Sequence, residues 1–158
     1  MIKGYVRPSL PGDPEKIAPI LRAEDKQEID AAVGLDYVEI LSISMHTSLV
    51  PLTIVDANEE PFAMLGAARN SNVPEYGHPW LMSSDYLFKA RLPFIRQSRM
   101  WRDVLEQPYK IVGNVVDERN TKHIRWLKWL GYKFVNRHPE YGVQRKPFLE
   151  FTRICHHV

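Results

Sequence analysis

The chain has 158 residues, and its 21 Lys and Arg against 19 Asp and Glu give a formal net charge of +2. This length predicts a single domain over residues 1–158 that is large enough to fold alone, and the small charge excess gives no strong signal for nucleic-acid binding. One cysteine excludes an internal disulfide, and the apolar stretches are interrupted by Asp, Glu, Ser and His, so neither a transmembrane span nor a signal peptide is expected.

The N-terminal residues predict a short strand followed by a helix. The strand covers residues 2–7 and ends at Pro8, which cannot continue a ladder of hydrogen bonds. A helix follows over about 14–22, with Asp13 as its expected cap. Its apolar residues, which we expect to be buried, are Ile17, Ile20 and Leu21.

Two more helices are predicted before the first hairpin. Residues 24–33 form an acidic helix that Gly34 ends, because glycine readily adopts the left-handed conformation found after helices. Asp36 is placed to cap the next helix, whose apolar residues follow at helical spacing. These residues are Val38, Leu41 and Met45.

The middle of the chain predicts strands. Residues 49–55 and 61–67 flank a polar loop and indicate a β-hairpin. A polar loop over 69–78 leads to a central strand over 79–84. After one turn at 85–89, the main helix is expected over 93–107. Its expected inner face consists of Phe94, Gln97, Ser98, Trp101, Val104 and Leu105.

The C-terminal part predicts a strand over 109–116, a helix over 120–130 and strands at 132–135 and 147–154. A connection through a helix predicts that strands 79–84 and 109–116 are parallel. Asn120 is expected to cap the helix after the second of these strands, and Gly131 to end it. Its expected inner face consists of Ile124, Leu127 and Leu130.

This last unit resembles the C-terminal half of the GCN5-related N-acetyltransferase (GNAT) superfamily. Asn120 and the pair Gly131-Tyr132 keep the superfamily's spacing of Asn and Gly-Phe, with His123 at its small-residue position. The run Asn-Thr-x-His-Ile-Arg-x-Leu-x-x-x-Gly is similar to one GNAT-like group, internal virion protein A and its relatives in short-tailed phages. The resemblance implies an α/β fold: a mixed sheet of about seven strands with helices on both faces, in which strands 79–84 and 109–116 diverge.

The cofactor loop of the superfamily is altered. The resemblance implies acetyl-CoA held by backbone N–H groups of a glycine-rich loop at the start of the main helix. The corresponding residues 82–93 contain no glycine, and Asp85 would place a negative charge near the phosphates. Leu127 stands where the family has a tyrosine that protonates the thiolate. We therefore expect no cofactor.

A variant mode of acetyl-CoA binding remains an alternative. The residues that would then bind the cofactor are Ser83, Ser84, Lys89, Arg91 and Asn120. The side chains of Lys89 and Arg91 would replace the missing backbone donors, and Asn120 would bond a pantetheine amide.

Two residues are candidates for catalysis. His123 could act as a general base because the unperturbed pKa of histidine lies near neutrality, or it could be a helix-start histidine that faces the sheet or solvent. Asp117 could place a carboxylate at the edge of the sheet, or it could belong to a solvated turn. Cys155 with His156 and His157 offers too few ligands for a metal site, and no metal is expected.

Two functions follow. The first is a phage structural or accessory protein, an internal, core or morphogenesis component of the virion, without ordinary acetyltransferase activity. Its partners would be other virion proteins, and it would be located in the virion or the host cytoplasm. The alternative is an acetyl-CoA-dependent N-acyltransferase that acts on an amine. The glycine-free loop favours the first.

Overall fold

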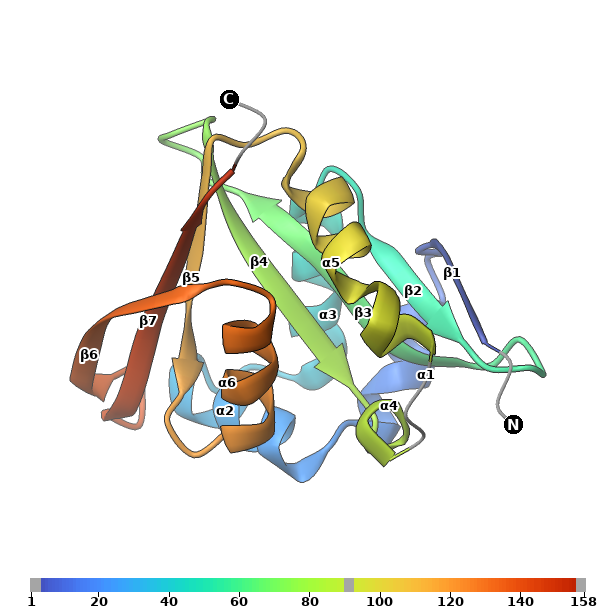
Figure 1. Cartoon of the computed structure of the whole chain (residues 1–158). Helices are drawn as coiled ribbons and strands as arrows, with labels where there is room; N and C mark the ends of the chain where they lie inside the picture. Colours follow the sequence, from blue (N-terminus) through green and yellow to red (C-terminus); the bar gives the residue numbers. More distant parts are fainter. Residues whose placement is uncertain (1–3, 90–92, 156–158) are drawn as a thin grey trace.

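The computed structural model describes residues 4–89 and 93–155. Their strands form a seven-stranded mixed sheet in the order β1-β2-β3-β4-β5-β7-β6 (Figure 1). The strands are β1 (Tyr5–Pro8), β2 (Leu52–Val55), β3 (Pro61–Arg69), β4 (Tyr76–Ser83), β5 (Ile111–Asp117), β6 (Lys133–Tyr141) and β7 (Lys146–Ile154). The predicted sheet, with helices on both faces, is confirmed.

Helices cover both faces of this sheet (Figure 1). One face carries α1 (Asp13–Ile17), the 3-10 helix η1 (Ala18–Ile20), α2 (Ala23–Ala32) and α3 (Tyr37–Thr47). The other face carries α5 (Pro93–Glu106) and α6 (Thr121–Trp129), and the single turn α4 (Tyr86–Lys89) follows the end of β4. Because the central strands are covered on both sides, β3 is buried at seven consecutive positions rather than at alternate ones.

Each face has its own hydrophobic core. The core beneath α5 and α6 includes Phe94, Leu105, Leu127, Leu130 and Phe151. The core beneath the N-terminal helices includes Ile17, Leu21, Ile29, Leu41 and Met64. The sheet therefore separates two faces that can be compared directly.

Strands β4 and β5 are parallel, as predicted, but they pair over only two positions. Tyr76 lies opposite Ile111 and Gly77 opposite Val112, after which the strands diverge (Figure 1). Strand β4 begins three residues before the predicted start at 79. A Cβ atom built on Gly77 would lie only 2.6 Å from the ring of Tyr109. Because glycine has no Cβ, the two chain segments can approach closely here.

Several local signals are confirmed. Asp36 caps α3 by accepting a hydrogen bond from the backbone N–H of Glu39 at 3.2 Å. Gly34 and Gly131 follow their helices with φ of 66° and 95°. The hairpin of β2 and β3 is antiparallel.

Other expectations about side chains were wrong. Gly12, not Asp13, holds the cap position of α1, and Asp13 accepts hydrogen bonds from Arg7 and from the backbone of Leu10 instead. Ile20 is exposed, and it is the last residue of η1 rather than part of a continuous α-helix. On α5, Gln97 and Val104 are exposed because they lie at the edge of the face that Phe94, Ser98 and Leu105 define.

Candidate functional site

Five of the predicted site residues lie at the ends of β4 and β5, where these strands diverge, and at the start of α6. Ser83 ends β4 and Ser84 follows it, Asp117 ends β5, Asn120 precedes α6, and His123 lies in the first turn of α6. All five are buried, with exposed fractions between 0% and 7%. Lys89 lies exposed at the end of α4, and Arg91 lies outside the described residues.

A buried ion pair from the start of α2 lies at the centre of the group. Arg22 Nη2 donates to Asp25 Oδ1 at 2.7 Å and to Asn120 Oδ1 at 3.0 Å. Asp25 Oδ2 accepts the backbone N–H of Ser83 at 2.9 Å, and the backbone N–H of Arg22 donates to the Ser83 carbonyl at 2.9 Å. We call these four residues the Arg22 network. It fixes α2 to the end of β4 and to α6.

Sequence reasoning missed both charged members of the Arg22 network. Arg22, Asp25 and Ile29 are spaced three and four residues apart, which places them on one face of a helix. Ile29 is buried, and Arg22 and Asp25 lie on the same face of the helix. This shared face was the signal in the sequence that the two charged residues are buried as well.

The side chain of Asn120 does not cap α6, which corrects the prediction. Asn120 holds the cap position, and its carbonyl accepts the N–H of Ile124 at 3.0 Å, but its side chain makes no capping bond. Its Nδ2 instead points to Asp25 at 3.4 Å and Glu28 at 3.5 Å. The long-range network therefore takes the amide that a local cap would use.

Side chains bridge the gap that opens between β4 and β5. Asn114 Nδ2 donates to the Pro79 carbonyl at 3.0 Å, and His78 Nδ1 lies 2.9 Å from the Gly113 carbonyl. These contacts satisfy backbone carbonyls that lose their strand partner as the two strands separate. Polar side chains thus bridge the two strands where they diverge.

Asp117 is not part of a solvated turn, because its exposed fraction is 1%. Arg119 Nη2 donates to its carboxylate at 2.7 Å, and the backbone N–H of Asp117 donates to Glu28 Oε1 at 2.8 Å. The carboxylate of Asp117 is therefore buried and paired with Arg119.

His123 faces the interior and is 7% exposed. Burial lowers its pKa to about 4, with the nearby charge of Arg22 acting in the same direction, so the imidazole is neutral at pH 7. The ring lies 5.8 Å from that of Trp126. His123 lines a cavity on each face of the sheet.

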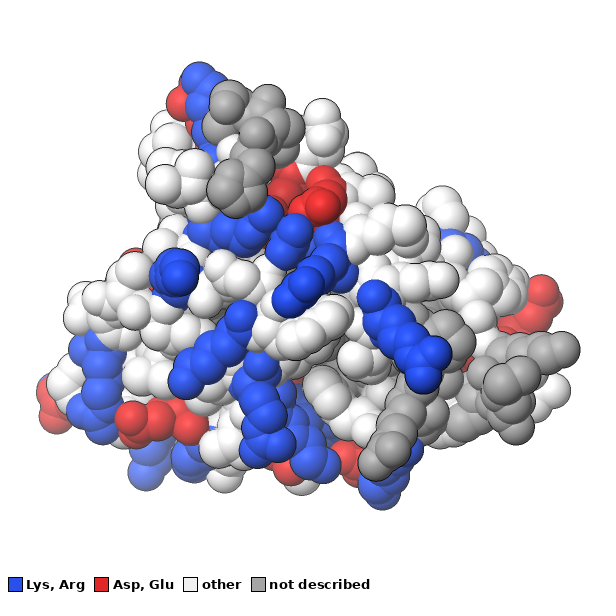
Figure 2. Space-filling model, viewed as in Figure 1, with Lys and Arg blue, Asp and Glu red and all other residues white. Residues whose placement is uncertain are grey.

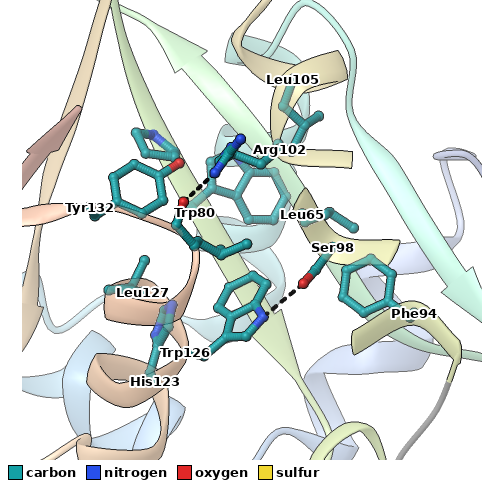
Figure 3. Close-up of a pocket in the computed structure, with 13 residues that line it drawn as sticks. Leu65, Trp80, Phe94, Ser98, Arg102, Leu105, His123, Trp126, Leu127 and Tyr132 are labelled. Atoms are coloured by element: carbon teal, nitrogen blue, oxygen red, sulfur yellow. Dashed lines mark hydrogen bonds between the residues drawn. The ribbon is translucent and has the colours of Figure 1, made fainter. Parts of the chain in front are cut away.

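The cavity on the α5 and α6 face is small. Its volume is about 30 Å³, and its lining includes Trp80, Phe94 and Trp126 (Figure 3). Trp126 Nε1 donates to Ser98 Oγ at 3.2 Å across the two helices. A space of this size holds on the order of one or two water molecules.

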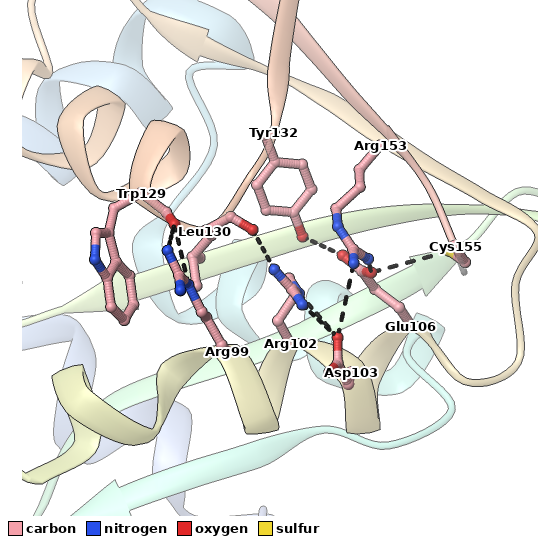
Figure 4. Close-up of polar contacts among 9 residues, drawn as sticks. All are labelled: Arg99, Arg102, Asp103, Glu106, Trp129, Leu130, Tyr132, Arg153 and Cys155. Carbon is pink, nitrogen blue, oxygen red and sulfur yellow. Dashed lines mark hydrogen bonds and ion pairs between the residues drawn. The ribbon is translucent and has the colours of Figure 1, made fainter. Parts of the chain in front are cut away.

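Two arginines hold α5 and α6 together (Figure 4). Arg99 Nη2 donates to the Trp129 carbonyl at 2.9 Å, and Arg102 donates to the Leu130 carbonyl. These bonds use carbonyls that are left unpaired at the C-terminus of α6. They keep the adjacent cavity small.

The cavity on the α2 face is larger, at about 260 Å³. Glu28, His78, Trp80, Asn114 and His123 are among its lining residues. Burial raises the pKa of Glu28 to about 8, and the negative charge of Asp25 adds to the effect, while the bond from the Asp117 backbone opposes it. Glu28 is therefore a candidate proton acceptor that sequence reasoning missed, and nothing in its local sequence indicated it.

A second buried network lies at the end of α5 (Figure 4). Glu106 is 1% exposed, accepts the Tyr132 hydroxyl at 2.5 Å and pairs with Arg153. Cys155 Sγ lies 3.9 Å from the same carboxylate, and burial raises the thiol pKa to about 11. We call Glu106, Tyr132, Arg153 and Cys155 the Glu106 network.

Some buried polar atoms of the site make no hydrogen bond with the residues that the structure describes. Arg22 Nη1, Ser83 Oγ and Ser84 Oγ are buried without a hydrogen-bond partner among them. Over the same residues, no group of three or more His, Cys, Asp or Glu is placed to hold a metal.

None of the helices in residues 4–89 and 93–155 is long and apolar enough to cross a membrane.

Comparisons with known proteins bear on this site. A family model described as "Bacteriophage T7, probable scaffold protein Gp13" matches residues 71–139. That span includes β4, α5, β5 and α6 but not α2. No curated protein matches the chain.

Solved structures are similar over nearly the whole chain. Ard1 from Thermoplasma volcanium is 17% identical with a TM-score of 0.69, and the alignment covers 96% of this chain and 97% of that one. A GNAT from Kribbella flavida is 17% identical with a TM-score of 0.65, covering 96% and 97%. A GNAT-family acetyltransferase from Streptococcus pneumoniae is 10% identical with a TM-score of 0.63, covering 96% and 99%. The chain therefore has the GNAT fold, and its central part matches a phage scaffold family.

Proposed function

We propose that the protein is a phage structural or accessory protein, an internal, core or morphogenesis component of the virion, in which a GNAT fold works without ordinary acetyl transfer. Its partners are other virion proteins, and it acts in the virion or the host cytoplasm. The match of residues 71–139 to a phage scaffold family supports the phage part of this proposal.

The Arg22 network is the observation that supports the proposed absence of acetyl transfer. A cofactor arm placed between the ends of β4 and β5 would have to separate Arg22 from Asp25 or from Asn120. Leaving one charge of a buried pair without its partner costs about 3–5 kcal/mol. The small volume of the cavity on the other face, about 30 Å³, supports the same conclusion.

The segment after β4 gives independent support. The backbone N–H groups of Leu87, Phe88 and Lys89 donate to carbonyls of Ser84 and Asp85 within α4. A phosphate-binding loop needs such N–H groups free and pointing at the ligand. Here they are used inside a helical turn.

A thermal shift titration with acetyl-CoA tests this part. A true site at a hundredfold excess over Kd would add about 2.7 kcal/mol to the free energy of unfolding. We expect no dose-dependent rise in melting temperature. A rise that is lost in the Lys89→Glu, Arg91→Glu double variant and kept in Lys16→Glu, an exposed change on α1, would contradict the proposal.

Particle composition tests the structural role. Procapsids and mature virions of a phage that encodes this protein would be purified and probed by immunoblot. We expect the protein in one or both, and fewer infectious particles when its gene is deleted. Absence from both, with normal particle yields after deletion, would sink the proposal.

An acetyl-CoA-dependent N-acyltransferase is the second candidate, and one observation favours it. Glu28, with its pKa raised to about 8, lines a cavity of about 260 Å³ that could take an amine. The buried unpartnered atoms of Arg22, Ser83 and Ser84 are also compatible with a ligand. Acetyl transfer that Glu28→Gln abolishes in a folded protein would establish this candidate.

A further inference from the structure

A groove lies on the outer surface where α4, the start of α5 and the exposed side of α6 meet. Its volume is about 590 Å³. Its apolar part is formed by Phe88, Ile95, Trp126 and Trp129. Its basic part is formed by Arg96, Lys122 and Arg125. We call these seven residues the basic aromatic groove.

Positive charge gathers around this groove although the whole chain is nearly neutral. Helix α6 carries Lys122, Arg125 and Lys128 and no acidic residue. Figure 2 shows Lys and Arg side chains over the face that α5 and α6 form. Among the residues that the structure describes, no ion pair involves Arg96, Lys122 or Arg125. The groove therefore presents charge that the fold itself leaves uncompensated.

The aromatic wall of the groove is held in place. Trp129 is 42% exposed, and the guanidinium carbon of Arg99 lies 4.3 Å from its ring centroid. Arg99 also donates to the Trp129 carbonyl, which links the same side chain to the end of α6. A fixed, exposed tryptophan beside arginines has the composition of a binding hot spot. Covering its apolar surface is favourable.

We propose that the basic aromatic groove docks a short acidic and apolar segment of a partner protein. Apolar side chains of the segment would pack on Trp126 and Trp129, and its carboxylates would face Arg96, Lys122 and Arg125. A volume of this order takes a few side chains rather than a domain surface. This inference rests on the proposed function only in taking the partner to be an assembly protein.

The geometry favours a peptide over single-stranded nucleic acid. Bases stack on open aromatic faces along a basic track. Here Arg99 covers a face of Trp129, and Trp126 is half-buried with its indole N–H bonded to Ser98. Side chains entering a hollow suit this arrangement better than stacked bases.

The test uses a synthetic amphipathic peptide with Glu on one face and Leu and Trp on the other. Its control is the same peptide with every Glu replaced by Lys. Isothermal titration calorimetry with the full chain should give saturable binding of the acidic peptide, weakened by added salt, and none of the basic one. Arg125→Glu and Trp129→Ala should each weaken binding about tenfold or more. Lys16→Glu, a matched change at an exposed site on α1, should leave binding unchanged.

Both groove variants alter exposed side chains, and their melting temperatures check that the fold is kept. Failure of the acidic peptide to bind, or binding that Arg125→Glu leaves unchanged, would overturn the inference. So would an oligothymidylate or coenzyme A that displaces the peptide and binds more tightly in an Arg125-dependent way. Peptide failure with normal incorporation into particles removes this inference and leaves the proposed function. Absence from particles with intact peptide binding does the reverse.

Discussion

The Arg22 network and the Glu106 network both bury an arginine beside a carboxylate, but they differ in what surrounds the pair. The Arg22 network lies between strands that diverge, and Arg22 Nη1 remains without a partner among the described residues. The Glu106 network lies where β5 and β7 pair continuously, and Tyr132, Arg153 and Cys155 all contact its carboxylate. The positive charge of Arg102 also acts to lower the pKa of the Glu106 carboxyl, against the larger effect of burial.

The difference shows how side chains can bridge two strands that diverge. At the Glu106 network, backbone pairing is complete and the ion pair only joins α5 to neighbouring strands. At the Arg22 network, side chains of α2 take over hydrogen bonds that a neighbouring strand would make, as Asp25 does for the N–H of Ser83. The second kind of network should be harder to remove.

The largest effect is expected for Arg22→Met. This change leaves Asp25, which is 4% exposed, without its cation, at a cost of about 3–5 kcal/mol in the free energy of unfolding. Urea denaturation measures it. Arg125→Met, at an exposed site without an ion pair, is the control and should stay within about 0.5 kcal/mol of wild type. A loss in the free energy of unfolding no larger than that of Arg125→Met would mean that the Arg22 network does not stabilise the region between the diverging strands.

Leu127→Ala probes α6, the helix between Asn120 of the Arg22 network and Tyr132 of the Glu106 network. Leu127 is 3% exposed on α6, and its truncation should cost about 2–5 kcal/mol through the cavity it leaves. Leu127→Met nearly conserves volume and should cost less than about 1.5 kcal/mol. Equal losses in the two variants by urea denaturation would show that volume at this position is not what matters.

Arg153→Met should cost less than Arg22→Met, about 1–3 kcal/mol near pH 7. Burial already raises the pKa of Glu106, so the carboxyl can take up a proton when its partner is lost. Because Arg153 favours the ionised carboxylate, the stability deficit of the variant should be smaller at low pH, where the carboxyl of Glu106 is protonated, and should grow as the pH rises. A deficit that does not change with pH would contradict this account.

The smallest effect is expected for Glu28→Gln, and it depends on pH. With the folded pKa raised to about 8, the folded state holds a proton that the unfolded chain releases above its ordinary pKa near 4.3, so stability should fall as pH rises toward 8. The lowered pKa of His123 acts in the opposite direction up to about pH 6.5, which leaves the Glu28 effect visible above it.

The measurement is the free energy of unfolding at several values between about pH 6.5 and 8. Wild type should lose at most about 1.4 kcal/mol per pH unit, and Glu28→Gln should be nearly flat. Parallel slopes in the two proteins would refute a proton on Glu28. Glutamine keeps an oxygen that can accept the Asp117 N–H, so the backbone contact is preserved.

The sequence by itself determined the order of elements, the hairpin of β2 and β3, the cap at Asp36 and the turns at Gly34 and Gly131. These depend on residues near one another in the chain, whose periodicity and backbone preferences can be read directly. The parallel relation of β4 and β5 also followed, because a helix of this length must connect them.

Only the tertiary structure decided the site. Arg22 meets Asn120, which is 98 residues away in sequence, and Asp25 meets Ser83 at a separation of 58. Periodicity indicates which face of a helix is buried, but it does not indicate which charged residue lies on the element that packs against that face. The same limit explains why the side chain of Asn120 does not form the cap that its local pattern predicted. Buried Arg22 and Asp25 bind its side-chain amide instead of the end of the helix.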